Sequence, residues 1–291
     1  MARIVCIGEG MIELIRRPGG DAIGFGGDTL NTAIHLARRG HDVAYLTALG
    51  NDPFSAHLRL QWTEEQIDTS LVLTHPTRQP GLYAITVDNL GERSFTYWRD
   101  MSAAREMFSL PGIEDAAIAV KKADLVYFSL ITLAILPPEG RDRLLNIARQ
   151  AHAVAFDGNY RPLLWASSEE ARSARDAAIS VSDIGLPTLD DETALSGEPD
   201  AKSVARHWTS LGCTETVVKL GGIGCSLPDG EIVPPPLALK PVDTSGAGDA
   251  FNAGYLDARL SGASTVEAAH AGHAIAGWTI LRAGAIPPRG S

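Results

Sequence analysis

The fold follows from two apolar runs, Ile4-Val5-Cys6-Ile7 and Val43-Ala44-Tyr45-Leu46-Thr47-Ala48, with a helical stretch at 29–39 between them. Both runs are short, rich in β-branched and aromatic residues, and without polar alternation, as expected for strands covered on both faces. A helix between two such strands is typical of parallel strands joined by a crossover. The chain therefore begins as an α/β fold.

The same alternation continues through the rest of the chain. Because parallel strands of this kind need helices on both faces, it predicts an α/β sandwich. Further strands are expected at 125–128, 154–156, 184–186 and 216–220, and further helices at 53–65, 139–150, 168–180, 190–196, 202–211, 250–260 and 265–281.

One segment interrupts this rhythm with a predicted hairpin. Its arms are 82–87 and 94–99, and the polar turn 88–93 between them contains a glycine. The hairpin is either an extra edge of the main sheet or a flap over a site. Tyr97 and Arg99 lie two residues apart and so share one face, which favours the flap.

Composition and charge exclude several classes of protein. The 291 residues carry 25 Lys+Arg against 35 Asp+Glu, a net charge of −10, which argues against a nucleic-acid partner because phosphate binding needs a clustered basic surface. The longest uncharged apolar stretch, 125–138, contains Ser129 and Thr132 and ends in two prolines, so we expect a core segment and no membrane partner. The N-terminus lacks the apolar length of a secretory signal, and we expect a cytoplasmic protein.

Cysteine and histidine spacing predicts no structural metal site. The three cysteines, Cys6, Cys213 and Cys225, form no C-x-x-C pair, and reduced, largely buried thiols are expected. His270 and His273 could present two zinc ligands from one helix, but no third ligand is near in the sequence, which favours ordinary helix histidines.

The densest functional signal is the box Asp243-Thr244-Ser245-Gly246-Ala247-Gly248-Asp249, which opens a helix. Small residues let the backbone approach a ligand closely, and a helix N-terminus offers free N–H groups, so phosphate is the natural occupant. Asp249 would then accept a proton from an attacking hydroxyl. Alternatively it only complements the helix dipole, worth roughly 0.3 to 1 kcal/mol. Spacing alone leaves both interpretations open.

Two other glycine clusters are candidates for ligand contact. Lys219-Leu220-Gly221-Gly222-Ile223-Gly224 follows a predicted strand and forms either a nucleotide contact or a tight turn. Gly26-Gly27-Asp28-Thr29-Leu30-Asn31 precedes a helix, whose cap explains one residue but not both glycines and Asn31, so a sugar contact is the sharper hypothesis. The chain has no P-loop motif, and Phe251 replaces the third glycine of a dinucleotide fingerprint.

Together these clusters resemble the ribokinase-like (PfkB) carbohydrate kinase family. The resemblance covers nearly the whole chain and rests on Gly26-Gly27 with Asn31, on 49–54, on 219–224 and on 243–251, in that order. It implies a three-layer α/β/α sandwich with a mostly parallel central sheet and a small β-strand lid. The chain 1–291 would form a single kinase domain, with lid segments at approximately 10–27 and 80–100.

Other stretches narrow the resemblance to the bacterial 2-keto-3-deoxygluconate kinases, namely 27–32, 80–83, 91–99, 157–165 and 188–192. These kinases act on an acid sugar, and the implied activity is ATP-dependent phosphorylation of 2-keto-3-deoxygluconate at its terminal hydroxyl. A planar guanidinium holds a carboxylate in a bidentate manner, so Arg99 and Arg161 are residues that a kinase of neutral sugars would not need. Each arginine alone could instead be an ordinary surface ion-pair residue.

The resemblance also implies the role of each matched residue. Asp249 is the implied catalytic base, and Gly246, Ala247 and Gly248 form the anion hole for the transferring phosphoryl group. The remaining matched residues divide into a sugar set, Gly27, Asp28, Asn31, Tyr83, Tyr97, Arg99, Arg161, Asp243 and Asp249, and an ATP set, Asn159, Arg161, Lys219, Gly221, Gly222, Gly224, Gly246 and Gly248.

ATP and Mg²⁺ are the implied cofactors, because Mg²⁺ prefers phosphate oxygens and few protein ligands. The family commonly carries an Asn-x-x-Glu box that handles the metal and phosphates. Thr188 and Asp191 stand at the matching positions here, with Glu192 adjacent. Asp191 can supply the carboxylate with a shorter reach, whereas Thr188 cannot copy an amide, so Asp191 is the candidate metal residue.

Three other functions compete with this one. The protein could be a kinase of the same family for a neutral sugar such as fructose or for a nucleoside, or a catalytically silent sugar-binding protein on the same fold. A nucleotide-dependent oxidoreductase is disfavoured by the incomplete dinucleotide fingerprint. An exposed hairpin edge also leads us to expect a homo-oligomer.

Overall fold

The computed structural model describes residues 1–16, 20–87 and 93–289. Its largest sheet runs in the order β12-β11-β10-β9-β1-β4-β5, with β6 paired to β4, and its pairs are parallel. These strands are β1 (Arg3–Ile7), β4 (Asp42–Leu49), β5 (Ile67–Asp68), β6 (Val72–Thr74), β9 (Leu125–Ser129), β10 (Val154–Asp157), β11 (Ile184–Gly185) and β12 (Glu215–Thr216).

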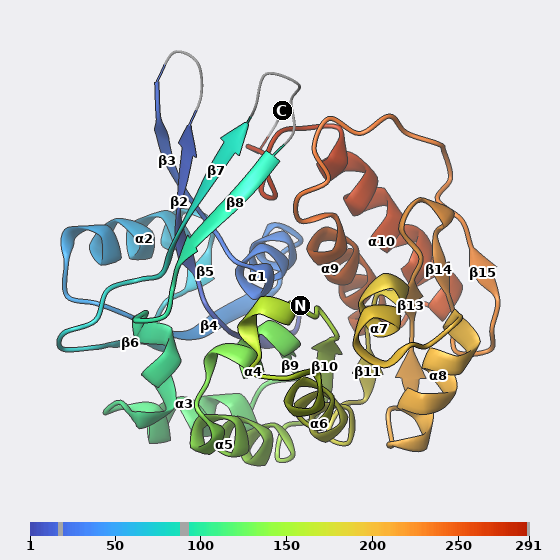
Figure 1. The fold of residues 1–291 in the computed structure, drawn as a ribbon, viewed down its shortest axis with the longest axis horizontal. Coiled ribbons are helices and arrows are strands. Elements are labelled where there is room, and N and C mark those ends of the chain that lie inside the picture. Colours follow the sequence, from blue (N-terminus) through green and yellow to red (C-terminus); the bar gives the residue numbers. More distant parts are fainter. Residues whose placement is uncertain (17–19, 88–92, 290–291) are drawn as a thin grey trace.

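Helices cover both faces of this sheet (Figure 1). Val5 and Ile7 of β1 pack into a core that also holds residues of α3, α5, α6 and α8, whereas Ile4 and Cys6 pack into a core with α1, α2, α9 and α10. The α/β/α sandwich is therefore confirmed. The helices are α1 (Asp28–Arg38), α2 (Pro53–Glu64), α3 (Ile113–Lys121), α4 (Leu130–Ile135), α5 (Pro138–Ala148), α6 (Ser168–Ile179), α7 (Leu189–Ser196), α8 (Ala201–Ser210), α9 (Ala247–Leu260) and α10 (Thr265–Ile280), with 3₁₀ turns at Ala103–Ser109, Pro162–Leu164 and Gly221–Ile223.

A second sheet projects from one edge of the sandwich (Figure 1). It has the order β3-β2-β7-β8, from β3 (Ala22–Gly26), β2 (Met11–Arg16), β7 (Leu82–Val87) and β8 (Arg93–Trp98). β7 and β8 form the expected antiparallel hairpin, whose turn at 88–92 lies outside the described residues. Because β7 pairs with β2 and not with the main sheet in the described part of the chain, the alternative of an edge hairpin of the main sheet is wrong. We call this four-stranded sheet the lid.

The single strand expected at 216–220 is wrong, because the segment divides between two sheets. Thr216 pairs with Gly185 in the main sheet, whereas β13 (Val218–Lys219) pairs antiparallel with β14 (Cys225–Ser226), which pairs with β15 (Ile232–Val233). Gly221 and Gly224 have φ values of +60° and +123°, which turn the chain back on itself. The tight-turn interpretation of this glycine cluster therefore holds geometrically.

Several helices also differ from the sequence-based expectation. Helix α9 begins at Ala247, three residues before the predicted start, because Gly246 adopts a left-handed conformation and caps it. Helices α3 and α4 are absent from the sequence-based expectation, although the buried residues of α3, Ile113, Ala116, Ala117 and Val120, follow the i, i+3, i+4, i+7 spacing of an apolar helix face. In the described residues we find no helix that is both long and apolar enough to span a bilayer.

Candidate active site

Asp249 lies in the first turn of α9, where helix N–H groups have no partner within the helix. The preceding Gly246 has φ +69°, and a Cβ atom on it would lie 2.5 Å from Cβ of Ala285. Glycine is therefore required here by both backbone conformation and space. The Gly246-Ala247-Gly248 turn presents the positive end of the α9 dipole beside Asp249, as an anion hole requires.

The carboxylate of Asp249 is held by helix α1. Nδ2 of Asn31 donates to Oδ2 of Asp249 at 2.8 Å, and Oγ1 of Thr32 donates to the Asp249 carbonyl at 3.3 Å. Burial, together with the charge of Asp28, raises the pKa of Asp249 to about 8, although the Asn31 hydrogen bond opposes the shift. A buried carboxylate with a pKa in this range suits proton abstraction near neutral pH.

A second aspartate lies close to the first. Asp28 is the first residue of α1, and Nδ2 of Asn159 donates to its Oδ2 at 3.2 Å. Burial raises the pKa of Asp28, with a hydrogen bond from Ser129 opposing. Asn159, which we predict to bind ATP, therefore contacts Asp28, which we predict to bind the sugar.

Lys219 carries positive charge to the start of α9. Its Nζ lies 3.0 Å from Oδ1 of Asp157 and 3.1 Å from Oδ1 of Asn252, and a Cβ atom on Gly248 would lie 3.6 Å from it. Nδ2 of Asn252 in turn donates to Oδ2 of Asp157 at 2.8 Å. The ammonium group is therefore fixed beside the glycine turn that would bind phosphate.

Sequence reasoning missed Asp157 and Asn252 as parts of the site. A signal for each was present: Asp157 ends β10 at the carboxyl edge of a parallel sheet, where ligands bind in open α/β folds. Asn252 lies three residues after Asp249 and so on the same face of α9.

The lid contributes two tyrosines to this region, and one of them packs against Gly26 at the end of β3. The hydroxyl of Tyr83 donates to Glu13, and the Tyr83 and Tyr97 rings lie 5.9 Å apart. A Cβ atom on Gly26 would lie 2.2 Å from the Tyr83 hydroxyl. Gly26 thus permits the close approach of the Tyr83 hydroxyl, while Tyr97 remains 51% exposed.

The two predicted arginines differ in environment. Nη2 of Arg99 donates to Oε2 of Glu9, and both side chains are buried, so Arg99 is not a surface ion-pair residue. The side chain of Arg161 is 52% exposed and lies 3.5 Å from Oδ1 of Asp191.

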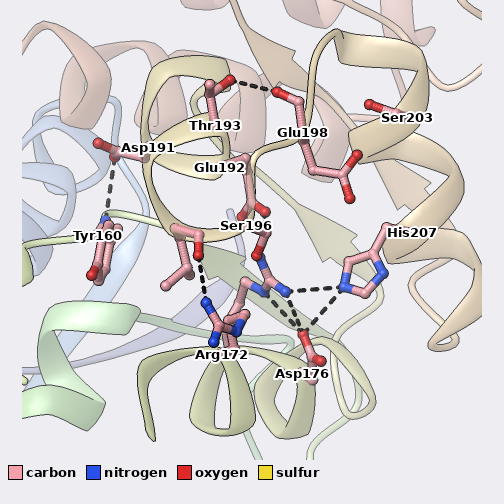
Figure 2. Close-up of polar contacts among 12 residues, drawn as sticks. Tyr160, Arg172, Asp176, Asp191, Glu192, Thr193, Ser196, Glu198, Ser203 and His207 are labelled. Carbon is pink, nitrogen blue, oxygen red and sulfur yellow. Dashed lines mark hydrogen bonds and ion pairs between the residues drawn. The ribbon is translucent and has the colours of Figure 1, made fainter. Parts of the chain in front are cut away.

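Asp191 is positioned by the loop that carries Arg161. The backbone N–H of Tyr160 donates to Oδ2 of Asp191 at 3.3 Å, as Figure 2 shows. Burial raises the pKa of Asp191, and the Arg161 charge opposes this shift. Thr188 is the N-cap of α7 but makes no side-chain capping hydrogen bond.

Within 1–16, 20–87 and 93–289, no group of three or more acidic, His or Cys side chains could hold a metal by itself. A single carboxylate fits Mg²⁺ that takes most of its ligands from phosphates and water.

The remaining predicted residues lie at the margins of this cluster. Asp243 accepts hydrogen bonds from the N–H groups of Ser245, at 3.0 Å, and Gly284, at 2.5 Å, and so braces the box against the C-terminal segment. A Cβ atom on Gly221 or Gly222 would meet no described atom within 4 Å, so their turn borders open space. A Cβ atom on Gly224 would lie 2.2 Å from the Val233 carbonyl, which gives this glycine a structural reason.

Similarity to known proteins agrees with this arrangement. Residues 1–289 match the family model for the pfkB family carbohydrate kinases. The chain is 43% identical to 2-dehydro-3-deoxygluconokinase of Escherichia coli (strain K12), over 99% of this chain and 97% of that protein. It is 38% identical to the 2-dehydro-3-deoxygluconokinase of Haemophilus influenzae, over 98% of this chain and 96% of that protein.

Solved structures agree as well. The PfkB protein from Polaromonas sp. JS666 superposes with a TM-score of 0.83 at 30% identity, covering 95% of each chain. Aminoimidazole riboside kinase from Salmonella enterica, solved with aminoimidazole riboside and an ATP analog, shares the fold with a TM-score of 0.81 at 24% identity, over 97% of this chain and 95% of that chain. With the family match, the near full-length relatives and a buried aspartate at the start of α9, the chain belongs to the pfkB family of carbohydrate kinases.

Proposed function

We propose that the protein transfers the γ-phosphoryl group of ATP to the terminal hydroxyl of 2-keto-3-deoxygluconate. The observation that carries the proposal is Asp249, buried in the first turn of α9 and held by Asn31, with a pKa raised to about 8. The identity of the sugar is supported by the relatives, which are named for this substrate under its synonym 2-dehydro-3-deoxygluconate.

In the proposed reaction Asp249 accepts the proton of the terminal hydroxyl as the hydroxyl oxygen bonds to the γ-phosphorus of ATP. The bond from that phosphorus to the bridging oxygen breaks, and ADP leaves with the electron pair. The N–H groups of the Gly246-Ala247-Gly248 turn and the Lys219 ammonium stabilise the charge on the transferring group. Mg²⁺, when bound, would neutralise phosphate charge, and Asp191 is the residue that would hold it.

The sugar occupies the space between the lid and the sandwich in this proposal. On the sandwich side, the sugar contacts the start of α1 through Gly27, Asp28 and Asn31. On the lid side, it is covered by Tyr83 and Tyr97. Arg99 and Arg161 recognise its carboxylate. Closure of the lid would exclude water, which competes with the sugar hydroxyl for the phosphoryl group.

The proposal extends to the whole chain. Residues 1–291 form a single kinase domain whose lid segments are approximately 10–27 and 80–100, and ATP use places the enzyme in the cytoplasm. The lid exposes apolar side chains, among them Ile23, Phe95 and Trp98, which supports a homo-oligomer formed through the lid.

A coupled ADP-release assay with ATP and Mg²⁺ tests the proposal. The substrates are 2-keto-3-deoxygluconate, 2-keto-3-deoxygalactonate, fructose, ribose and adenosine. We expect the highest kcat/KM for 2-keto-3-deoxygluconate. Preference for fructose, ribose or adenosine would reject the acid sugar and favour a neutral-substrate kinase, and no turnover on any of them would favour a silent sugar-binding protein.

A further inference from the structure

Glu9 and Arg99 form an ion pair between two of the segments that join the lid to the sandwich. Glu9 lies between the end of β1 and the start of β2, and Arg99 directly follows β8 (Figure 1). Nη2 of Arg99 donates to Oε2 of Glu9. The pair therefore links the segment that leads into β2 to the segment that follows β8.

Stability alone does not explain this pair. The Arg99 and Glu9 side chains are only 7% and 1% exposed, so both charges have lost their water. Oε1 of Glu9 and Nε of Arg99 are also buried without a hydrogen-bond partner in the described residues. A buried ion pair with unpaired polar atoms adds little net stability, because desolvation offsets the attraction. We therefore look for the role of this pair in the position that it gives to the Arg99 guanidinium.

The surroundings hold Glu9 in one position. A Cβ atom on Gly81 would lie 2.7 Å from Oε1 of Glu9 and 3.3 Å from Cβ of Arg99. A Cβ atom on Gly27 would lie 2.2 Å from the Glu9 carbonyl oxygen. Glu9 is thus packed between Gly27, which precedes α1, and Gly81, which precedes β7.

One arm of the Arg99 guanidinium remains available to a ligand. Among the described residues Nη1 has no hydrogen-bond partner, yet it is not among the enclosed polar atoms. The guanidinium carbon lies 5.9 Å from the centre of the Tyr97 ring, which is a lid residue of the sugar site. Burial raises the pKa of Asp28, and the charge of Arg99 opposes that rise. Arg99 therefore borders the proposed sugar site with its Nη1 amino group unpaired in the described residues.

We propose that Glu9 is a positioning residue for acid-sugar recognition. By binding Nη2, it fixes the plane of the Arg99 guanidinium so that Nη1 is left for the carboxylate of the sugar. The inference rests on the proposed function and adds to it a residue that acts through Arg99 and not on the phosphoryl group. Glu9 controls geometry, because the Glu9–Arg99 pair has no net charge to attract an anion.

A double-mutant cycle on sugar affinity tests this role. We expect Glu9→Ala and Arg99→Met each to raise KM for 2-keto-3-deoxygluconate by ~10-fold or more. The double variant should be no worse than the worse single variant, because the two residues act as a unit. KM for MgATP should stay within ~2-fold of wild type in all three. An unchanged sugar KM in folded Glu9→Ala would overturn the proposal, as would parallel increases in both KM values.

Conservative variants keep the test decisive if Glu9→Ala does not fold. Glu9→Gln retains an oxygen at the same place to accept from Nη2, so its sugar KM should remain within ~3-fold of wild type. Glu9→Asp keeps the charge but is one methylene shorter, so it should shift the guanidinium and raise the sugar KM by ~10-fold. The reverse order would mean that charge and not position matters, and would reject the proposal.

A matched control separates this effect from general destabilisation. Arg259 on α9 forms an ion pair with Glu215 at 2.7 Å, at the end of the helix remote from Asp249. Arg259→Met should lower the melting temperature and leave the sugar KM unchanged. The substrate panel on the wild-type enzyme distinguishes the two failures: preference for a neutral sugar rejects the proposed function, whereas preference for the acid sugar with a normal sugar KM in Glu9→Ala rejects only the role of Glu9.

Discussion

At the scale of single residues, the candidate site gathers negative charge where we propose that phosphate binds. Asp28 and Asp157 both raise the pKa of Asp249 through their charge, in addition to burial. Lys219 opposes them from beside the start of α9. This arrangement disfavours the ionised carboxylate at rest and so makes Asp249 a stronger base than an exposed aspartate.

The proton-accepting role that we propose for Asp249 predicts a selective loss of turnover. Asp249→Asn keeps the size of the side chain and a carbonyl oxygen beside Asn31 but cannot take a proton. We expect kcat to fall by ~10²- to 10⁴-fold while both KM values change by less than ~3-fold. Steady-state kinetics with 2-keto-3-deoxygluconate and MgATP provide the measurement. Near-normal turnover would mean that Asp249 only complements the helix dipole.

The raised pKa of Asp249 predicts the acid limb of the pH profile. Because the base must be ionised, kcat/KM should fall as pH drops below about 8. Asp28→Asn removes a neighbouring negative charge, so the limb should move to lower pH in that variant. Profiles of kcat/KM from pH 5.5 to 9.5 test both statements. A limb that stays in place in Asp28→Asn would contradict the assigned cause of the shift.

At the scale of secondary-structure elements, the start of α9 is the feature on which the site depends. Gly246 has φ +69° and faces Ala285 so closely that an added Cβ atom would lie 2.5 Å from Cβ and 2.9 Å from Cα of that residue. The glycine therefore sets both the first helical residue and the distance of the turn from the C-terminal segment.

Gly246→Ala should consequently damage activity beyond its effect on stability. The left-handed conformation costs roughly 1–2 kcal/mol for a residue with a Cβ atom, and the clash moves the turn that carries Asp249. We expect kcat to fall on the order of 10- to 100-fold. Gly262→Ala is the matched control, because Gly262 has φ +84° just after α9 and nothing lies within 4 Å of its Cβ position. That variant should lose stability with kinetics intact, and equal kinetic losses in the two variants would refute the explanation.

The elements also show what could be predicted from sequence. Short apolar runs identify β1, β4, β9 and β10 because their side chains are buried on both faces. The change of sheet after Thr216 is not predictable from the sequence, since 216–220 has the composition of one continuous strand and the backbone of Gly221 and Gly224 turns the chain back.

In the candidate site, too, residues within local motifs are predictable from the sequence, whereas contacts between distant residues are not. Asp249, Asn31 and Lys219 belong to local motifs, so the sequence alone predicts them as candidate site residues. The Glu9–Arg99 and Asp157–Asn252 contacts join residues 90 and 95 positions apart, so no local pattern could have paired them.

At the scale of the whole molecule, two buried carboxyl groups with raised pKa values reduce stability at neutral and alkaline pH. Asp249 has its pKa raised to about 8, and burial raises the pKa of Glu192 on α7 to about 7 despite its ion pair with Arg175. A carboxyl group whose pKa is higher in the folded state binds its proton more tightly there. The stability from this difference is fully present below the unfolded pKa, near 4, and is lost as pH rises through the folded pKa.

Asp249→Asn should therefore be more stable than wild type at high pH. Asparagine has no charge to bury, so the variant avoids the loss that wild type suffers between about pH 4 and 8. We expect its melting temperature to exceed that of wild type by at least ~2 °C at pH 8.5, with a smaller difference at pH 5. Calorimetry at both values provides the comparison. A difference that is constant with pH would mean that Asp249 is not protonated in the folded enzyme.

The central claim is that the enzyme transfers phosphate from ATP to the terminal hydroxyl of an acid sugar. The most direct test is the proton-coupled ³¹P spectrum of the product formed from ATP, Mg²⁺ and 2-keto-3-deoxygluconate. The account predicts one new phosphomonoester signal split into a triplet, because the terminal carbon bears two hydrogens. A doublet, which marks a secondary hydroxyl, or the absence of any phosphorylated sugar would contradict it.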